Sequence, residues 1–190
     1  MLSDKQFRER ARAGLRQIGD QLLSLAADRD VYRKFEREIV DNNPQLNNAR
    51  NAFLDMVRGA YADAMAARIL RLLDGDGASL PQVLSGLAQH EEIMRDKITE
   101  REFSDDRAAL QQAAVNIQRA MVPHSAHHER TLPALATLHR ELDAALDLMI
   151  ESAKTYYWIV ADSYLQFEVK YCGDPMSVFQ FPWAIPVLAK

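Results

Sequence analysis

The sequence predicts an all-α protein, a helical bundle of four to five principal helices with an extended, proline-containing C-terminal arm. Three observations support this prediction. Apolar residues recur every three or four positions over long stretches, as they do along one face of an α-helix. Capping residues and loop-forming residues separate these stretches. About half of the 190 residues are apolar (48%), which is enough for one buried core, and no pair of strand-like segments is present.

The first helix is expected to begin after the capping box Ser3-x-x-Gln6. Its apolar stripe comprises Phe7, Ala11, Leu15, Ile18, Leu22 and Leu25. Tyr32, Phe35 and Ile39 have the spacing to continue it. Pro44 ends this region, because the residue before a proline avoids helical backbone angles.

Three further helices are predicted in the middle of the chain. The second runs from about Asn48 to Leu73, and its expected buried side comprises Phe53, Val57, Ala60, Ala64, Ala67 and 70–73. The third begins at the capping box Ser79-x-x-Gln82 and reaches the 95–101 region. Ser104 is the predicted cap of the fourth, which ends near Met121.

The last long helix follows Pro123 and a polar connector over 124–130, with Thr131 as its expected N-cap. Its stripe is the most regular in the chain: Leu132, Leu135, Leu138, Leu142, Leu146, Met149, Ala153, Tyr156 and Val160. It is expected to end near Leu165. Residues 1–165 therefore form one predicted helical domain. Residues 166–190 are rich in aromatic side chains and prolines, so we expect an arm packed on the bundle or on a partner.

The composition limits the possible functions. The formal net charge is −4, so the whole chain is not a basic nucleic-acid binder. The single cysteine, Cys172, excludes an intramolecular disulfide, and we interpret it as structural rather than nucleophilic. No apolar run approaches the roughly 18 residues of a membrane span, and no signal-peptide pattern is present. We expect a cytoplasmic protein that does not associate with membranes.

Candidate catalytic residues gather in one segment of ten positions. They are Arg119, His124, His127 and His128. Histidine exchanges protons near neutral pH, and arginine binds phosphate through two parallel hydrogen bonds. An arginine at a helix end and a histidine in the next turn can both reach one phosphodiester.

Arg119 and His124 form an R-x4-H motif between two predicted helices. This motif resembles the signature of the HEPN superfamily, and more narrowly of its abortive-infection branch. The stretches 71–74, 79–84 and 138–147 also resemble that branch, so the resemblance covers roughly residues 50–160.

The resemblance implies a metal-independent endoribonuclease in bacterial defence or a toxin–antitoxin system. It implies a homodimer whose two motifs face one cleft, RNA as the substrate, an antitoxin protein as a candidate partner, and no cofactor. Arg119 would bind the scissile phosphate. His124 would act as base on the ribose 2′-hydroxyl or as acid to the leaving oxygen, with His127 and His128 as supporting candidates.

Other interpretations stay open. Family members often have a polar residue after the arginine, where this chain has Ala120, which also suits a non-catalytic helical interaction module. Arg119 is then a solvent-exposed charge near a helix C-terminus. His124 and His128 have i, i+4 spacing, which on a helix would place both on one face. Together with Glu129 they supply too few ligands for a zinc site, so we favour a site without metal. Residues 1–38 hold nine basic and seven acidic residues, a weakly basic face that could steer RNA or simply be solvated.

Overall fold

The computed structural model describes residues 3–43, 51–74, 79–125 and 132–168. These residues form helices and no strand, which confirms the predicted all-α bundle. The elements in chain order are α1 (Asp4–Phe35), the π-helix η1 (Glu36–Val40), α3 (Ala52–Leu73), α4 (Leu80–Leu87), α5 (Glu91–Met94), α6 (Glu100–Ser125) and α7 (Leu132–Ala161).

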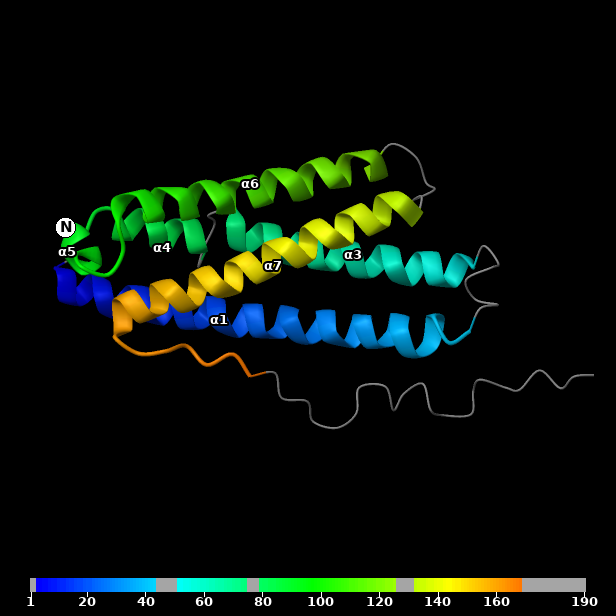
Figure 1. The fold of residues 1–190 in the computed structure, drawn as a ribbon, viewed down its shortest axis with the longest axis horizontal. Helices are drawn as coiled ribbons and strands as arrows, with labels where there is room; N and C mark the ends of the chain where they lie inside the picture. Colours follow the sequence, from blue (N-terminus) through cyan, green and yellow to red (C-terminus); the bar gives the residue numbers. More distant parts are fainter. Residues whose placement is uncertain (1–2, 44–50, 75–78, 126–131, 169–190) are drawn as a thin grey trace, which may run out of the picture.

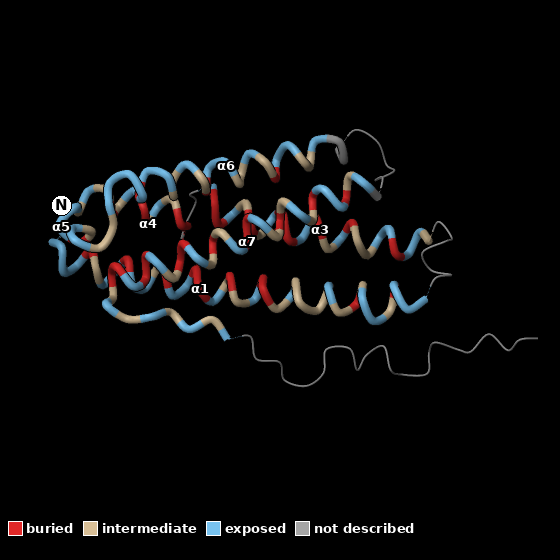
Figure 2. The backbone as a smooth tube through the Cα atoms, viewed as in Figure 1, coloured by how far each residue is buried: buried red, intermediate tan, exposed pale blue. Residues whose placement is uncertain are grey.

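Four long helices lie side by side, and α7 is central among them (Figure 1). It packs against α1, α3 and α6, while α4 fills the space beside the N-terminal half of α1 and the start of α6. Each long helix turns its buried residues toward this centre (Figure 2). No helix in the described part of the chain combines the length and the apolar character needed to cross a bilayer.

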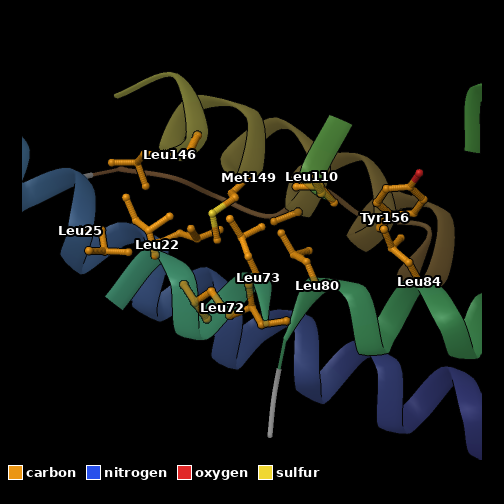
Figure 3. Close-up of a cluster of buried hydrophobic side chains, with 14 of the residues drawn as sticks. Leu22, Leu25, Leu72, Leu73, Leu80, Leu84, Leu110, Leu146, Met149 and Tyr156 are labelled. Atoms are coloured by element: carbon orange, nitrogen blue, oxygen red, sulfur yellow. The ribbon is translucent and has the colours of Figure 1, made fainter. Parts of the chain in front are cut away.

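The core follows the predicted stripes of the first and last helices. All six stripe residues of α1 are buried, and so are those of α7 from Leu135 to Val160. Figure 3 shows side chains from five helices meeting in this core. The labelled ones are Leu22, Leu25, Leu72, Leu73, Leu80, Leu84, Leu110, Leu146, Met149 and Tyr156. Burying each leucine contributes about 1.5–3 kcal/mol relative to an exposed position.

The predicted buried side of α3 was right at its C-terminal end, where Leu72 and Leu73 are buried, and wrong before it. Phe53 is 61% exposed, and Ala60, Ala64 and Ala67 also face solvent. The other buried residues of this helix are Leu54, Gly59, Ala62, Met65, Ala66 and Ile69. Alanines occur all round α3, so the apolar pattern does not fix which side is buried. The larger Met65 and Ile69 decide it, because they bury more apolar area.

The predicted third helix is two helices rather than one. The chain leaves α4 after Leu87, and His90 adopts a non-helical conformation (φ −130°) before α5. The His90 ring stacks on Phe7 with centroids 4.3 Å apart, and its Nδ1 lies 2.7 Å from a carboxylate oxygen of Asp4. These contacts with the N-terminus of α1 hold His90 in place between α4 and α5.

The fourth predicted helix begins earlier than expected. Ser104 lies inside α6, and the helix instead starts after Thr99, which forms a capping box with Glu102. The Glu102 N–H donates to the Thr99 hydroxyl (3.2 Å), and the Thr99 N–H donates to the Glu102 carboxylate (2.9 Å). The earlier start places Phe103 on the helix, where its side chain is buried.

The predicted end of α6 was wrong. Helix α6 continues through Pro123 to Ser125, four residues past the expected end at Met121. Proline lacks an N–H and therefore leaves the carbonyl of Arg119 without its donor four residues later. Thr131, the predicted cap of α7, lies outside the described residues.

The chain leaves α7 at Asp162, whose φ of 51° ends the helix short of Leu165. Residues 162–168 then run back along α1 without regular structure (Figure 1, orange). The side chain of Leu165 lies so close to Gly19 that a Cβ there would come within 2.9 Å of Leu165 Cδ2. Within the predicted arm, Phe167 is partly buried against the core, while 169–190 lie outside the described residues.

Candidate functional site

Arg119 lies on the outer face of α6 and lines an open pocket between α6 and α7. The pocket has a volume of about 370 Å³. Its lining residues are Asn116, Arg119 and Ala120 of α6 with Ala134, Thr137 and Glu141 of α7. Cationic, amide, hydroxyl and carboxylate groups therefore converge on a space large enough for a phosphate group.

The Arg119 guanidinium has no hydrogen bond or ion pair with any residue that the structure describes. Arg29 and Arg33, by contrast, pair with Asp147 and Asp143 at 2.6 and 2.8 Å. Across the pocket, the Glu141 carboxylate lies 3.5 Å from the neighbouring Arg140. The five N–H donors of Arg119 are consequently available to an external anion.

The outer face of α6 around Arg119 has an unusual composition. Between residues 111 and 122 Arg119 is the sole charged residue. Val115 and Val122 lie at i−4 and i+3 from it, on the same face of the helix, and are 43% and 66% exposed. An exposed helix face with two valines around one arginine resembles the charge-poor centre of a protein interface.

The structure places His124 in the last turn of α6, five residues after Arg119. Five residues correspond to a rotation of about 140° about a regular helix axis, so the helix itself does not bring these two positions onto one face. The structure does not describe the His124 side chain. His127 and His128 lie outside the described residues, as does Cys172.

No metal centre is present in the described part of the chain, where no three His, Cys, Asp or Glu side chains gather closely enough to hold an ion. The alternative zinc set of His124, His128 and Glu129 falls largely on the undescribed segment 126–131.

Sequence reasoning missed a polar cluster between α1, η1, α3 and α7. Arg58 donates two hydrogen bonds to Glu36, each 2.8 Å long, and the Tyr32 hydroxyl donates a third at 2.8 Å. The Tyr32 and Tyr61 rings stack with centroids 3.8 Å apart. The His139 ring meets both edge-on, at 5.1 and 5.5 Å. We call these five residues the His139 cluster.

Burial controls the protonation of this cluster. It lowers the pKa of His139, whose buried Nε2 has no hydrogen-bond partner. It raises the pKa of Tyr32, and the bond to Glu36 adds to that effect. Burial alone would raise the pKa of Glu36, but hydrogen bonds from Arg58 and Tyr32 outweigh it and the pKa is lowered. The cluster therefore combines a charged Arg58–Glu36 pair with a histidine that favours its neutral form.

Comparison of the chain with protein-family models, curated proteins and solved structures found no match.

Proposed function

We propose that this protein is a metal-independent endoribonuclease of HEPN type that acts in bacterial defence or in a toxin–antitoxin system. The observation that supports this proposal is the exposed Arg119 guanidinium, which lines a pocket and pairs with no acidic residue among those that the structure describes. Arginine stays charged at physiological pH and matches the geometry of a phosphate. The R-x4-H spacing to His124 supplies a proton-transfer group on the same helix.

The proposed reaction uses the ribose 2′-hydroxyl of the RNA. A histidine takes its proton while the 2′-oxygen attacks phosphorus, and the bond from phosphorus to the 5′-oxygen breaks. A second acid delivers a proton to that leaving oxygen, which gives a 2′,3′-cyclic phosphate and a free 5′-hydroxyl. Arg119 stabilises the charge that builds on the non-bridging oxygens. DNA lacks the 2′-hydroxyl and should survive.

Homodimer formation through α6 fits this chemistry. The helix alone separates the Arg119 and His124 positions by about 140°, so a second copy is a simple way to bring both groups to one phosphate. Val115 and Val122 lie exposed on either side of Arg119 and supply apolar area that a two-fold interface would bury. The dimer would then hold two composite sites, each with Arg119 of one copy and His124 of the other.

The decisive test is cleavage of RNA by the purified protein in EDTA. We expect cleavage by the native chain and a loss of about 100-fold or more in kcat/KM for Arg119→Ala and for His124→Ala. Arg10→Ala is the matched control, because Arg10 is an exposed arginine of α1 away from the pocket. Equal cleavage by all variants would reveal a contaminating nuclease and remove the support for this site.

A mixing experiment tests the shared site. Arg119→Ala and His124→Ala proteins are combined, allowed to exchange subunits and assayed. A composite site regains cleavage, because one of the two sites in each mixed dimer keeps both residues. Continued inactivity of a mixture shown to contain mixed dimers would place Arg119 and His124 of one chain in the same site.

A non-catalytic helical interaction module is the second candidate function. Phe53 and Met56 favour it, since both are 61% exposed one turn apart at the start of α3. In that case no RNA is cleaved by the native chain, and Arg119→Ala and His124→Ala change neither the fold nor any activity.

A further inference from the structure

Two arginines of α1 share a single tyrosine of α7, far from the Arg119 pocket. The Nε atoms of Arg12 and Arg16 lie 3.4 and 2.9 Å from the Tyr157 hydroxyl oxygen, and both donate to it. The Arg16 guanidinium also lies 6.0 Å from the centre of the Tyr157 ring. Tyr157 is only 3% exposed, whereas both arginines reach solvent. A buried group thus holds two surface cations side by side.

This arrangement differs from that of the other arginines on the same helix. Farther along α1, Arg29 and Arg33 each pair with a carboxylate of α7. Arg12 and Arg16 pair with a phenol instead, and neither forms an ion pair with a carboxylate among the described residues. Each guanidinium uses its Nε–H on Tyr157, and no side chain that the structure describes accepts a hydrogen bond from its remaining N–H donors. The fold has therefore fixed two positive charges without neutralising them.

The Tyr157 hydroxyl shows the effect of these charges. Burial alone would raise its pKa, but the hydrogen bonds and charges of Arg12 and Arg16 outweigh burial and the pKa is lowered. A net positive field of this kind attracts anions. The carboxylate of Asp162, just after α7, is shared between Lys97 and Arg8, with its second oxygen 3.8 Å from Arg8.

Two exposed aromatic rings follow Tyr157 in the chain, and one of them lies beside a cationic side chain. Trp158 follows Tyr157 on α7 and is 36% exposed, and the Lys97 ammonium lies 5.4 Å from its ring centre. Tyr164, in the segment that runs back along α1, is 83% exposed. Rings beside cationic side chains are typical of surfaces that bind single-stranded nucleic acid, where bases stack and phosphates pair with arginine.

We propose that Arg12 and Arg16, held in place by Tyr157, bind a phosphate of single-stranded RNA at a site remote from Arg119. The choice of RNA as the ligand rests on the proposed function. Tyr157 lies twenty residues along α7 from Thr137, which lines the Arg119 pocket, and this corresponds to about 30 Å of helix. The site would hold a flanking part of the strand, several nucleotides from the bond that is cleaved.

The test measures binding of a fluorescent 2′-O-methyl RNA, which cannot be cleaved through its 2′-position. The double variant Arg12→Gln/Arg16→Gln is compared with a control double variant, Arg10→Gln/Arg71→Gln. The control removes the same charge from exposed arginines elsewhere. We expect the first pair to weaken binding about ten-fold or more and the second much less. The slope of log K against log salt should also fall by about 0.7 for each lost phosphate contact. Equal losses of RNA affinity in both double variants would show that only the net charge matters and would overturn the proposal.

Tyr157→Phe separates orientation from charge. It keeps the buried ring and both arginines but removes the shared oxygen, so we expect a smaller loss of RNA affinity than from the double arginine variant. Circular dichroism confirms that the helices remain. Affinity equal to that of the native chain would show that Tyr157 does not position the arginines for RNA.

The binding assay and the cleavage assay test the two proposals separately, because the 2′-O-methyl RNA used for binding cannot be cleaved. Full binding by the double arginine variant, beside a cleavage defect in Arg119→Ala, would overturn the site and leave the nuclease standing. Selective loss of binding, in a protein that cleaves no RNA, would support the site and reject the nuclease. A native chain that binds inorganic phosphate but no RNA would also overturn the assignment.

Discussion

Arg58 of α3 holds Glu36, the first residue of η1, through two parallel hydrogen bonds of 2.8 Å each. The pair joins two elements that are 22 residues apart in the chain. Only 16% of the Arg58 side chain and 23% of the Glu36 side chain are exposed, so neither charge is fully solvated once its partner is gone. The pair lies beside a small separate hydrophobic cluster that joins the same elements, with Phe35, Val40 and Leu54 as its buried members.

Glu36→Ala should therefore destabilise the fold markedly. We expect a loss of about 2–3 kcal/mol in the free energy of unfolding, below the roughly 3–5 kcal/mol for breaking a fully buried pair because both side chains keep some exposure. Urea unfolding at neutral pH measures it. The matched control is Glu38→Ala, whose partner Arg37 is 68% exposed and which should cost less than about 0.5 kcal/mol. Similar losses in the two variants would show that the Arg58 pair has no special role.

The buried His139 predicts a dependence of stability on pH. Burial lowers the pKa of His139 in the folded state below its value near 6.5 in the unfolded chain. At pH values between these two pKa values, the unfolded chain therefore binds more protons than the folded one. The free energy of unfolding should accordingly be constant with respect to this group above about pH 6.5 and should decrease as the pH falls below it. Glu36, whose pKa is lowered, loses its contribution only in the more acidic range below about pH 4.3.

Denaturation curves at pH 7.5 and 5.5 test this prediction, with His139→Phe as the variant. Phenylalanine keeps an aromatic ring against Tyr32 and Tyr61 but cannot take up a proton. We expect the variant to lose less stability than the native chain between these two pH values. An unchanged loss would assign the pH dependence to other groups.

Much of the fold could be predicted because the patterns that determine it are local and repeated. The stripes of α1 and α7 use large aliphatic residues at helical spacing, and burial follows from them directly. The side of α3 could not be predicted in the same way, because its small alanines leave the pattern ambiguous. The break at His90 depends on Asp4 and Phe7, more than 80 positions earlier, and no local signal reports such a contact.

Only part of the candidate site could be predicted from the sequence. The sequence indicated Arg119 by type and spacing, and the structure shows that it lines a pocket. No local pattern indicated the His139 cluster or the Arg12–Tyr157 contact, because their members lie up to 145 positions apart and meet only after folding. Tertiary packing brings these residues together, and the local pattern of a single sequence does not indicate which distant residues will meet.

Tyr156→Phe tests the connection between α6 and α7. The Tyr156 side chain is fully buried, and its hydroxyl donates a 2.7 Å hydrogen bond to the Asp106 carboxylate. Phenylalanine preserves the ring and removes only this bond, so we expect a loss of about 1.5–3 kcal/mol in the free energy of unfolding, as for a bond to a charged group. Tyr164→Phe is the control, since Tyr164 is 83% exposed and should change stability little. Equal stability of the Tyr156 variant and the native chain would show that the bond contributes nothing net.

The start of α6 offers a test between two caps, because the sequence contains both Thr99-x-x-Glu102 and a downstream Ser104 followed by acids. The Thr99 hydroxyl accepts from the Glu102 N–H, and the Thr99 N–H donates to the Glu102 carboxylate, whereas Ser104 is an exposed residue within the helix. Thr99→Ala should therefore cost about 1 kcal/mol. Ser104→Ala should be neutral or slightly stabilising, because alanine has the higher helix propensity and no cap is lost. Thermal unfolding of both variants measures the difference, and the reverse order would mean that α6 begins at Ser104 in solution.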